Sequence, residues 1–391
     1  MASAFPKRAV PAIMTTTSML AEQETPVAAS TLTEVARLAG VSPATASRVL
    51  NGSARKPGPG VSERVRQAAA TLGYIPNAQA QALAKSSSGL VGLIVHDIAD
   101  PYFSAIARGV QEVAREQHKM VLLATTGGTP ADEKEAVAAF AARRADAIVI
   151  AGSRSSRPED ASGNAELAAE LDRYCRNGGH VGVVGQPVVG AGELEGYHLV
   201  EVPNEQLAAD LAGSLAASHS GDFVIVGGPK GLITSDDRIR GFQSGLAAAG
   251  RPAAEVLRAS FNRAGGYEAG LQLAQRIRDA RTGEAADDGA KPNLCIFAAN
   301  DVMAIGAAAA LRSQGFKVPR DALIAGFDDI ETLRDFRPGL STVRLPLEEI
   351  GRLATLSTLG SGSGGGEDGH YDNGHAVTGQ VTLRRSTEWT P

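Results

Sequence analysis

From residue 90 onward, short apolar runs alternate along the chain with longer stretches that have the length and composition of helices. The apolar runs span residues 90–95, 121–124, 147–150, 181–184, 223–226, 294–297 and 323–325. Strands that are apolar at nearly every position are typical of parallel sheets covered by helices on both faces. The pattern therefore predicts an α/β domain, and in such sheets ligands lie at the carboxyl ends of the strands.

The pattern is different between residues 31 and 52, where it predicts two short helices joined by a tight turn. Thr31 and Glu34 have the spacing of a capping box, and Gly40 is placed to end the helix that they begin. Ser42 is suited to cap a second helix that has Pro43 in its first turn. The apolar residues expected to face inward are Leu32, Val35, Ala36, Ala39, Ala46, Val49 and Leu50. Two short capped helices in this arrangement predict a helix-turn-helix, a small all-α unit.

The outward face of the second helix carries candidate DNA contacts. It consists of Pro43, Ala44, Thr45, Ser47 and Arg48. Small side chains near a helix start allow close entry into the major groove. There, Arg48 can donate two parallel hydrogen bonds to guanine, while Ala44 and the Thr45 methyl group can contact thymine methyl groups. By spacing alone, an ordinary helical hairpin with a solvated outer face is the alternative.

Two segments, VSPATASRVLNG at residues 41–52 and YIPNAQAQALA at residues 74–84, resemble the head and hinge of LacI-family regulators. The resemblance continues along almost the whole chain. It implies that Pro43, Ala44 and Arg48 read bases, and that Ser42, Ser47 and Asn51 hold phosphates. One departure from the family is SARKPGPG, at residues 53–60, which replaces the usual run into a third helix and is one residue longer. Arg55 and Lys56 are candidates to replace the backbone contacts normally made there.

Residues 77–88 are predicted to form a hinge helix and linker. Asn77 can cap a helix over residues 78–85, but this helix is shorter than the roughly 12 to 15 residues that an isolated helix needs to persist. The segment should therefore fold only with support. The resemblance implies that the partner subunit and the DNA minor groove supply it, with Leu83 inserted into the groove beside Ala80. A flexible linker is the alternative, because the segment runs into serines and a glycine.

Polar and aromatic residues follow several of the predicted strands, at the edge where a ligand would lie. They are Asp97, Phe103, Arg238, Phe261, Asn300, Asp301 and Asp328. The resemblance implies an effector pocket between two lobes of a type I periplasmic-binding-protein-like fold. In that pocket Arg238 would donate paired hydrogen bonds, Asp301 and Asp328 would accept from hydroxyls, and the two phenylalanines would stack on an apolar ring face.

Each of these residues also has a structural interpretation, which is a buried ion pair for the charged residues and core packing for the aromatic ones. His96, Gly185 and Leu345 depart from residues that contact ligand in some members of the family. The identity of the effector is therefore not carried over.

Composition and charge change this picture in two respects. Apolar residues make up 43% of the chain and no apolar run reaches the length of a membrane span, so we expect a soluble protein with no membrane contact. Cys175 and Cys295 are far apart, and the sequence has no zinc-ligand spacing. We therefore expect no metal, no cofactor and a reducing, cytoplasmic location.

The charge is unevenly distributed. Residues 30–85 carry seven Lys or Arg against two acidic residues, and residues 1–29 are balanced. Because the whole chain has a net charge of −5, residues 86–391 carry −10. A basic head on an acidic body suits binding to a polyanion through one end.

The predicted organisation has four parts, in chain order. They are a disordered extension at 1–29, a helix-turn-helix DNA-binding domain at 30–76, a hinge helix and linker at 77–88, and an effector-binding domain at 89–391. The N-lobe of the last domain is expected at about 89–200 plus 346–375, and the C-lobe at about 201–345 plus 376–391. The apolar stretch after Lys7 and Arg8 is too short for an export signal. The run of Gly and Ser at 360–366 is interpreted as a flexible loop.

The predicted function is that of a homodimeric transcription regulator, a repressor, that binds a pseudo-palindromic operator in double-stranded DNA and responds to a small-molecule effector of carbohydrate type. Two-fold symmetry of the protein implies two-fold symmetry of the operator. One competing class is a periplasmic-type sugar-binding protein, which needs an export signal and no head. Another is an enzyme built on Rossmann-like lobes. GGPKG, at residues 227–231, lacks the spacing of a phosphate loop, and no catalytic set is recognisable, so we expect no enzyme.

Overall fold

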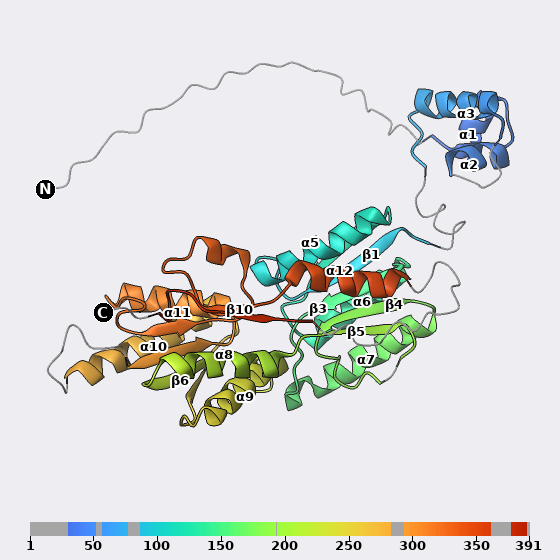
Figure 1. The fold of residues 1–391 in the computed structure, drawn as a ribbon. Helices are drawn as coiled ribbons and strands as arrows, with labels where there is room; N and C mark the ends of the chain where they lie inside the picture. Colours follow the sequence, from blue (N-terminus) through green and yellow to red (C-terminus); the bar gives the residue numbers. More distant parts are fainter. Residues whose placement is uncertain are drawn as a thin grey trace, which may run out of the picture. The chain divides into compact units, whose positions relative to one another are not determined.

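The computed structural model of the chain describes residues 30–51, 57–76, 87–192, 194–282, 293–360 and 377–388. The chain divides into one compact unit up to Gln81 and a second from Ala82, and each is described by itself (Figure 1). The predicted extension at 1–29, the hinge positions 77–86 and residues 361–366 of the Gly and Ser run lie outside the described residues. Among the described helices, none combines the length and the apolar character needed to cross a bilayer.

The first unit contains the helices α1 (Leu32–Ala39), α2 (Pro43–Leu50) and α3 (Pro59–Thr71). The predicted capping box is present, since Thr31 N donates to the Glu34 carboxylate at 2.7 Å and Glu34 N donates to Thr31 Oγ1 at 3.3 Å. Gly40 ends α1 with a φ of 66°, a conformation that glycine adopts without strain. The core consists mostly of alanines: Val35, Ala36, Ala39, Ala46, Val65, Ala68 and Ala69. These small side chains let three short helices pack closely around the turn.

The second unit consists of two α/β lobes (Figure 1). The first lobe contains a parallel sheet in the order β2-β1-β3-β4-β5. Its strands are β1 (Leu90–Val95), β2 (Met120–Thr125), β3 (Ala147–Ala151), β4 (His180–Gly185) and β5 (Tyr197–Glu201). Its helices are α5 (Pro101–Glu116), α6 (Pro130–Ala142), α7 (Ala161–Arg176) with the short η1 (Pro158–Asp160) before it, and α12 (Leu347–Leu359). The strands between these helices are apolar and mostly buried, as the sequence predicted.

The second lobe repeats this plan with a parallel sheet in the order β7-β6-β8-β9. Its strands are β6 (Asp222–Gly227), β7 (Glu255–Arg258), β8 (Leu294–Ala298) and β9 (Leu323–Ala325). The helices are α8 (Asn204–Ser218), α9 (Ile233–Ala248), α10 (Arg263–Thr282), α11 (Asp301–Ser313) and the short η2 (Glu331–Arg334). Phe242 of α9 stacks on Phe297 of β8 with ring centroids 4.3 Å apart, which fixes α9 on the sheet.

The chain passes from one lobe to the other three times. The connections follow β5, the strand β10 (Thr342–Arg344) and the helix α12, after which β11 (Gln380–Thr382) pairs with β10 in antiparallel fashion. Helix α12 therefore packs in the first lobe, although it follows the second lobe in the sequence. Gly109 of α5 allows this packing, because a Cβ there would lie 1.9 Å from the carbonyl oxygen of Glu348.

The chain enters β1 through a segment that Asp146 holds in place. The Asp146 carboxylate accepts hydrogen bonds from Ser87 Oγ and Ser88 N, both at 2.7 Å, and from Gly89 N at 3.1 Å. Lys119, just before β2, forms an ion pair with the same carboxylate. Burial opposes the charge, but these donors hold the pKa of Asp146 below its usual value. Residues 87–89 are thus attached at the point where β1, β2 and β3 begin.

Candidate functional site

Helix α2 presents most of its predicted DNA contacts to solvent. Ser42, Pro43, Ala44 and Arg48 are exposed, whereas Thr45, Ser47 and Asn51 are half-buried. Ser42 Oγ accepts a hydrogen bond from Thr45 N at 3.2 Å and caps the helix as predicted. Asn51 Nδ2 donates to Ser47 Oγ at 2.9 Å, which orders the other end of α2.

The outer face of α2 is suited to enter a groove, because only small side chains surround its first turn. The Arg48 guanidinium extends from this face, and no described residue forms an ion pair with it. An exposed guanidinium at this position can donate to a base edge or a phosphate. The hinge contacts predicted from the sequence, Asn77, Ala80 and Leu83, lie outside the described residues.

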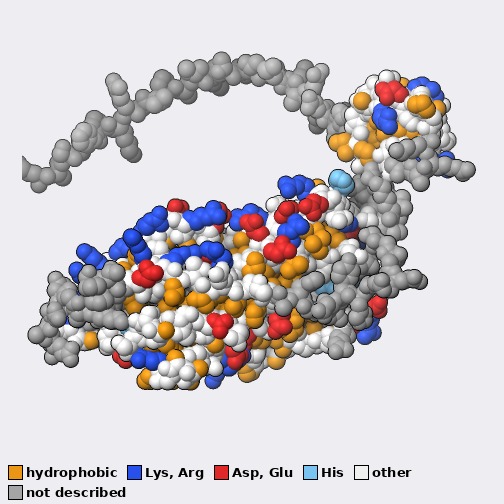
Figure 2. Space-filling model, viewed as in Figure 1, with side chains coloured by type: hydrophobic (Ala, Val, Ile, Leu, Met, Phe, Trp, Pro, Cys, Tyr) orange, Lys and Arg blue, Asp and Glu red, His pale blue; other side chains and the backbone are white. Residues whose placement is uncertain are grey.

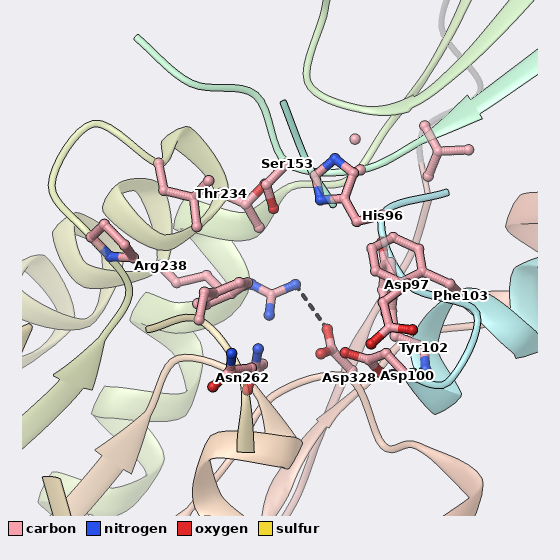
Figure 3. A pocket seen from close by; sticks show the side chains of 18 of the residues that line it. His96, Asp97, Asp100, Tyr102, Phe103, Ser153, Thr234, Arg238, Asn262 and Asp328 are labelled. Carbon is pink, nitrogen blue, oxygen red and sulfur yellow. Dashed lines mark hydrogen bonds and ion pairs between the residues drawn. The ribbon is translucent and has the colours of Figure 1, made fainter. Parts of the chain in front are cut away.

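A cavity of about 430 Å³ lies between the two lobes of the second unit (Figure 3). Its volume is within the range of small-molecule sites. Six of the seven predicted effector residues line it: Asp97, Phe103, Arg238, Phe261, Asn300 and Asp328. Two of the six, Asp97 after β1 and Phe103 in α5, belong to the first lobe. The other four come from loops and helices that follow strands of the second lobe. The structure thus brings together residues that lie up to 231 positions apart, from Asp97 to Asp328.

Arg238 and Asp328 form the centre of the cavity's second-lobe wall. Arg238 Nη2 donates to Asp328 Oδ1 at 2.8 Å, and Figure 3 shows this pair as a dashed line. Arg238 Nη1 donates to the carbonyl oxygen of Ala299, and Nε to Asn204 Oδ1, each at 2.8 Å. The guanidinium also lies 3.8 Å from the centroid of the Phe327 ring. Both side chains are almost fully buried, so the pair is a fixed part of the fold as well as a wall of the cavity.

Burial acts against the charge on the carboxylates of the cavity. It raises the pKa of Asp328 to about 6, although the neighbouring Arg238 opposes this rise. Burial also raises the pKa of Asp100, with a further contribution from the charge of Asp97. The charge of Asp100 in turn contributes to the rise in the pKa of Asp328.

Aromatic rings from both lobes line the cavity. Phe103 meets Tyr102 edge-on, with centroids 5.1 Å apart, and lies 5.5 Å from the His96 ring. Phe103 lines the cavity and is also part of the buried core. Phe261 packs over Gly228, where a Cβ would come within 2.8 Å of the Phe261 ring. Glycine at position 228 therefore lets this ring lie close to the loop after β6.

His96 belongs to a buried polar cluster behind the cavity. Its Nε2 lies 3.5 Å from Glu133 Oε1, and Arg154 forms an ion pair with the same carboxylate. Burial disfavours the charge of Glu133, but Arg154 and His96 hold the pKa of Glu133 below its usual value. The His96 ring fits between Gly128 and Gly152, where a Cβ on either residue would come within 2.9 Å of it. The ring is thus held with one nitrogen toward Glu133.

Asp301 is the one predicted effector residue that the structure does not bring to the cavity. Its carboxylate is buried and accepts hydrogen bonds from Thr342 Oγ1 at 2.7 Å and from Ile330 N at 3.0 Å. Asp301 is the first residue of α11, and these hydrogen bonds direct its side chain into the second lobe, away from the predicted contact with a ligand. Its neighbour Asn300 does line the cavity, and its Oδ1 caps α11 by accepting from Met303 N at 2.8 Å.

Several cavity residues were not among the predicted contacts. The cavity is also lined by Asp100, Tyr102 and Asn204. Of the three positions that depart from ligand contacts in the family, His96 and Gly185 line the cavity and Leu345 does not. Asp100 had a readable signal, because an acidic residue before Pro101 after a buried strand is typical of a helix start. Its side chain accepts from Tyr102 N at 2.9 Å. No signal in the sequence identified Asn204 as a cavity residue, since its position depends on the crossing between the lobes.

A second groove, on the outer surface, lies along α5, α12 and η2. Arginines and acidic residues are interspersed on the visible surface of the second unit (Figure 2). Arg108 pairs with Glu348 at 2.8 Å and with Glu331 at 3.2 Å, which links the first lobe to the second. Arg384 is similarly engaged by Asp329. Because opposite charges are already paired, this groove offers less to a charged ligand than its arginine content suggests.

No three His, Cys, Asp or Glu side chains among the described residues are grouped so that they could hold a metal ion. Cys175 is half-buried and Cys295 is buried. Burial raises the pKa of Cys175 to about 11, so this thiol is protonated at neutral pH.

Comparisons with known proteins agree with both units. The family model of bacterial regulatory proteins of the lacI family matches residues 31–77, and that of the periplasmic binding protein-like domain matches residues 212–387. The HTH-type transcriptional regulator GalS of Salmonella typhimurium is 31% identical over 340 residues, which cover 85% of this chain and 90% of GalS. The HTH-type transcriptional repressor CytR of Escherichia coli is 30% identical over 344 residues, covering 86% of this chain and 90% of CytR.

Solved structures resemble the chain along nearly its whole length. The complex of the transcriptional regulator CelR with cellobiose has a TM-score of 0.59 at 25% identity, covering 91% of this chain and 99% of CelR. The lac repressor dimer bound to operator and the anti-inducer ONPF has a TM-score of 0.71 at 21% identity, covering 92% and 99%, and supports the fold. With a helix-turn-helix unit, a two-lobed α/β unit and these relatives, the chain belongs to the LacI family of transcription regulators.

Proposed function

We propose that the protein is a homodimeric repressor that binds a pseudo-palindromic operator through α2 and is controlled by a carbohydrate effector held between its two lobes. The observation that carries the proposal is the presence, in one chain, of an exposed α2 face and an enclosed polar and aromatic cavity. The first is a DNA-reading surface and the second is a small-molecule site, so the two together make a regulator with a sensor.

The DNA contacts in this proposal are Ser42, Pro43, Ala44, Thr45, Ser47, Arg48 and Asn51 on and around α2, and Asn77, Ala80 and Leu83 in the hinge. Arg48 supplies the main base contact, because its donors are not engaged by any described residue. The hinge residues are proposed from the sequence alone.

A carbohydrate effector is supported by the chemistry of the cavity. Asp328 and Asn300 offer polar groups to hydroxyls, and Phe103 and Phe261 offer flat apolar faces. Among the similar proteins, CelR is solved with cellobiose, and a ribose operon repressor of Halalkalibacterium halodurans is 30% identical over 330 residues. A role in binding, without turnover, also fits these residues, since none pairs a nucleophile with a base.

The proposed dimer is supported by the edge of the first-lobe sheet. Strand β2 is an edge strand, and Met120 and Leu123 on it are 65% and 47% exposed. Exposed apolar side chains on an edge strand are typical of a surface that another chain covers. A dimer carries two copies of α2, so the operator would have two similar half-sites, and the protein would act where its DNA lies, in the cytoplasm.

The experiment that tests this function is selection of DNA from a random library by the full-length chain, repeated with individual sugars added. Enrichment of a pseudo-palindrome whose recovery changes with one sugar is the expected result. Enrichment of no sequence would refute the regulator, and an enriched sequence that no compound affects would refute the sensor. Incubating each sugar with the protein and looking for product tests the competing enzyme.

A further inference from the structure

The cavity has more carboxylates than free cations. Asp97, Asp100 and Asp328 all line it, and Figure 3 shows them near one another on one side. Each carboxylate has one hydrogen bond within the protein: Asp97 Oδ1 accepts from Ala99 N and Asp100 Oδ1 from Tyr102 N, both at 2.9 Å, and Asp328 Oδ1 accepts from Arg238. One oxygen of each carboxylate therefore keeps its capacity to accept from a ligand.

The two arginines that line the cavity are both engaged by carboxylates. Arg238 is held by Asp328, Asn204 and Ala299 as described above. Arg157 pairs with Asp160, with Nη2 at 2.8 Å and Nε at 3.0 Å. No lysine is among the lining residues. A phosphate group entering the cavity would meet Asp97 and Asp100, which form no ion pair with any described residue. The charges of Arg238 and Arg157 are balanced by Asp328 and Asp160.

The carboxylates of the cavity thus keep spare acceptor capacity that suits hydroxyl donors, alongside neutral donors such as the amides of Asn262 and Asn300. Phe103 and Phe261 add apolar surface, which suits the faces of a sugar ring. Like charges brought together in a desolvated site oppose binding strongly, whereas a neutral polyol has donors for each carboxylate and brings no charge.

We propose that the effector is an uncharged, hydroxyl-rich carbohydrate and that the cluster of Asp97, Asp100 and Asp328 excludes its phosphate esters. This inference rests on the proposed carbohydrate effector and narrows it to a chemical class.

The test uses calorimetry with the full-length chain and matched pairs of compounds. The pairs are glucose and glucose 6-phosphate, galactose and galactose 1-phosphate, and ribose and ribose 5-phosphate, with cellobiose as a neutral disaccharide. At least one neutral compound should bind, and its phosphate ester should bind about 100-fold more weakly or not at all. Tighter binding of a phosphate ester than of its neutral partner would overturn the inference. Binding of no compound would instead refute the carbohydrate effector itself.

Two variants assign the selectivity to these carboxylates. Asp100→Asn keeps a residue that caps α5 well, so the helix start is preserved while one negative charge is lost. Asp97→Asn makes the same change at the neighbouring position. Each variant should narrow the ratio between neutral and phosphorylated affinity, by about 5-fold or more. Asp210→Asn, an exposed residue of α8 that does not line the cavity, is the matched control and should leave the ratio unchanged. An unchanged ratio in both cavity variants would refute the role of the cluster.

Discussion

Replacing Arg238 by methionine should destabilise the second unit strongly, because it leaves a buried carboxylate without its partner. The substitution keeps most of the side-chain volume but removes the three hydrogen bonds to Asp328, Asn204 and Ala299. Arg238 and Asp328 have side chains only 3% and 6% exposed, so water cannot replace the guanidinium. Breaking a buried pair from one side typically costs about 3–5 kcal/mol, and we expect a loss of this size in the free energy of unfolding at about pH 8.

The loss should depend on pH. Burial already raises the pKa of Asp328 from 3.8 to about 6, and without Arg238 it rises further. A carboxyl group whose pKa is raised on folding favours the folded state at low pH, and this contribution disappears as the pH rises through the folded pKa. The deficit of Arg238→Met should therefore be smaller at about pH 5 than at about pH 8, while the part due to the lost hydrogen bonds to Asn204 and Ala299 should not depend on pH. Combining it with Asp328→Asn should restore about 1–3 kcal/mol, since no unpaired charge remains.

The assay is urea unfolding of the full-length chain followed by circular dichroism at several pH values, with each unfolding transition analysed separately. Arg240→Met, on the same helix but with a side chain 57% exposed, is the matched control and should cost less than about 1 kcal/mol. A loss below about 1 kcal/mol for Arg238→Met, or a loss that is the same at every pH, would show that the pair is not buried in solution.

Four further predictions concern DNA and effector binding. Arg48→Ala should weaken specific binding by about 1–3 kcal/mol and relax one operator position, whereas equal loss on random DNA would make Arg48 a phosphate contact. Effector affinity, measured by calorimetry, should fall as the pH drops through about 6, where Asp328 becomes protonated. Asp328→Asn should remove this pH dependence. If the pH dependence persists in the variant, another titrating group causes it. Leu83→Ala should weaken operator binding while effector affinity of the DNA-free protein stays nearly the same; full operator affinity would reduce the hinge to a linker. Asp146→Asn should preserve effector affinity but reduce the effect of the effector on operator affinity. This coupling free energy is typically about 1–3 kcal/mol. If operator titrations show the same coupling in the variant, the attachment at residues 87–89 takes no part in it.

The sequence predicted well the strands that are apolar at nearly every position, including the edge strand β2. The runs at 90–95 and 323–325 coincide with β1 and β9, and the other predicted strands differ from the observed ones by one or two residues at their ends. Strands β5 and β7 were not predicted, because polar residues at exposed positions interrupt their apolar pattern. Strand β10 was missed because it is three residues long and its partner strand β11 follows it after a whole helix.

The candidate site was predictable where a residue directly follows a strand, and less so elsewhere. Asp97, Asn300 and Asp328 follow strands and reach the cavity, but Asp301, one position further along, turns into the lobe. Sequence alone does not distinguish these directions, since they depend on where the helix begins. The position of Asn204 beside Arg238 depends on a crossing between lobes, which no local pattern encodes.

The hydrogen bonds between residues 87–89 and Asp146 fix the end of the linker to the effector-binding unit. Because the same carboxylate also binds Lys119 and directly precedes β3, the linker end moves with the sheet of the first lobe as one body. A movement of that lobe would therefore carry residues 87–89 with it. In a dimer, the separation of the two linker ends would then report directly on the angle between the two first lobes. In such a dimer, each first lobe would rotate as a rigid body about the segments that cross between the lobes, and this rotation would change the positions of the linker ends.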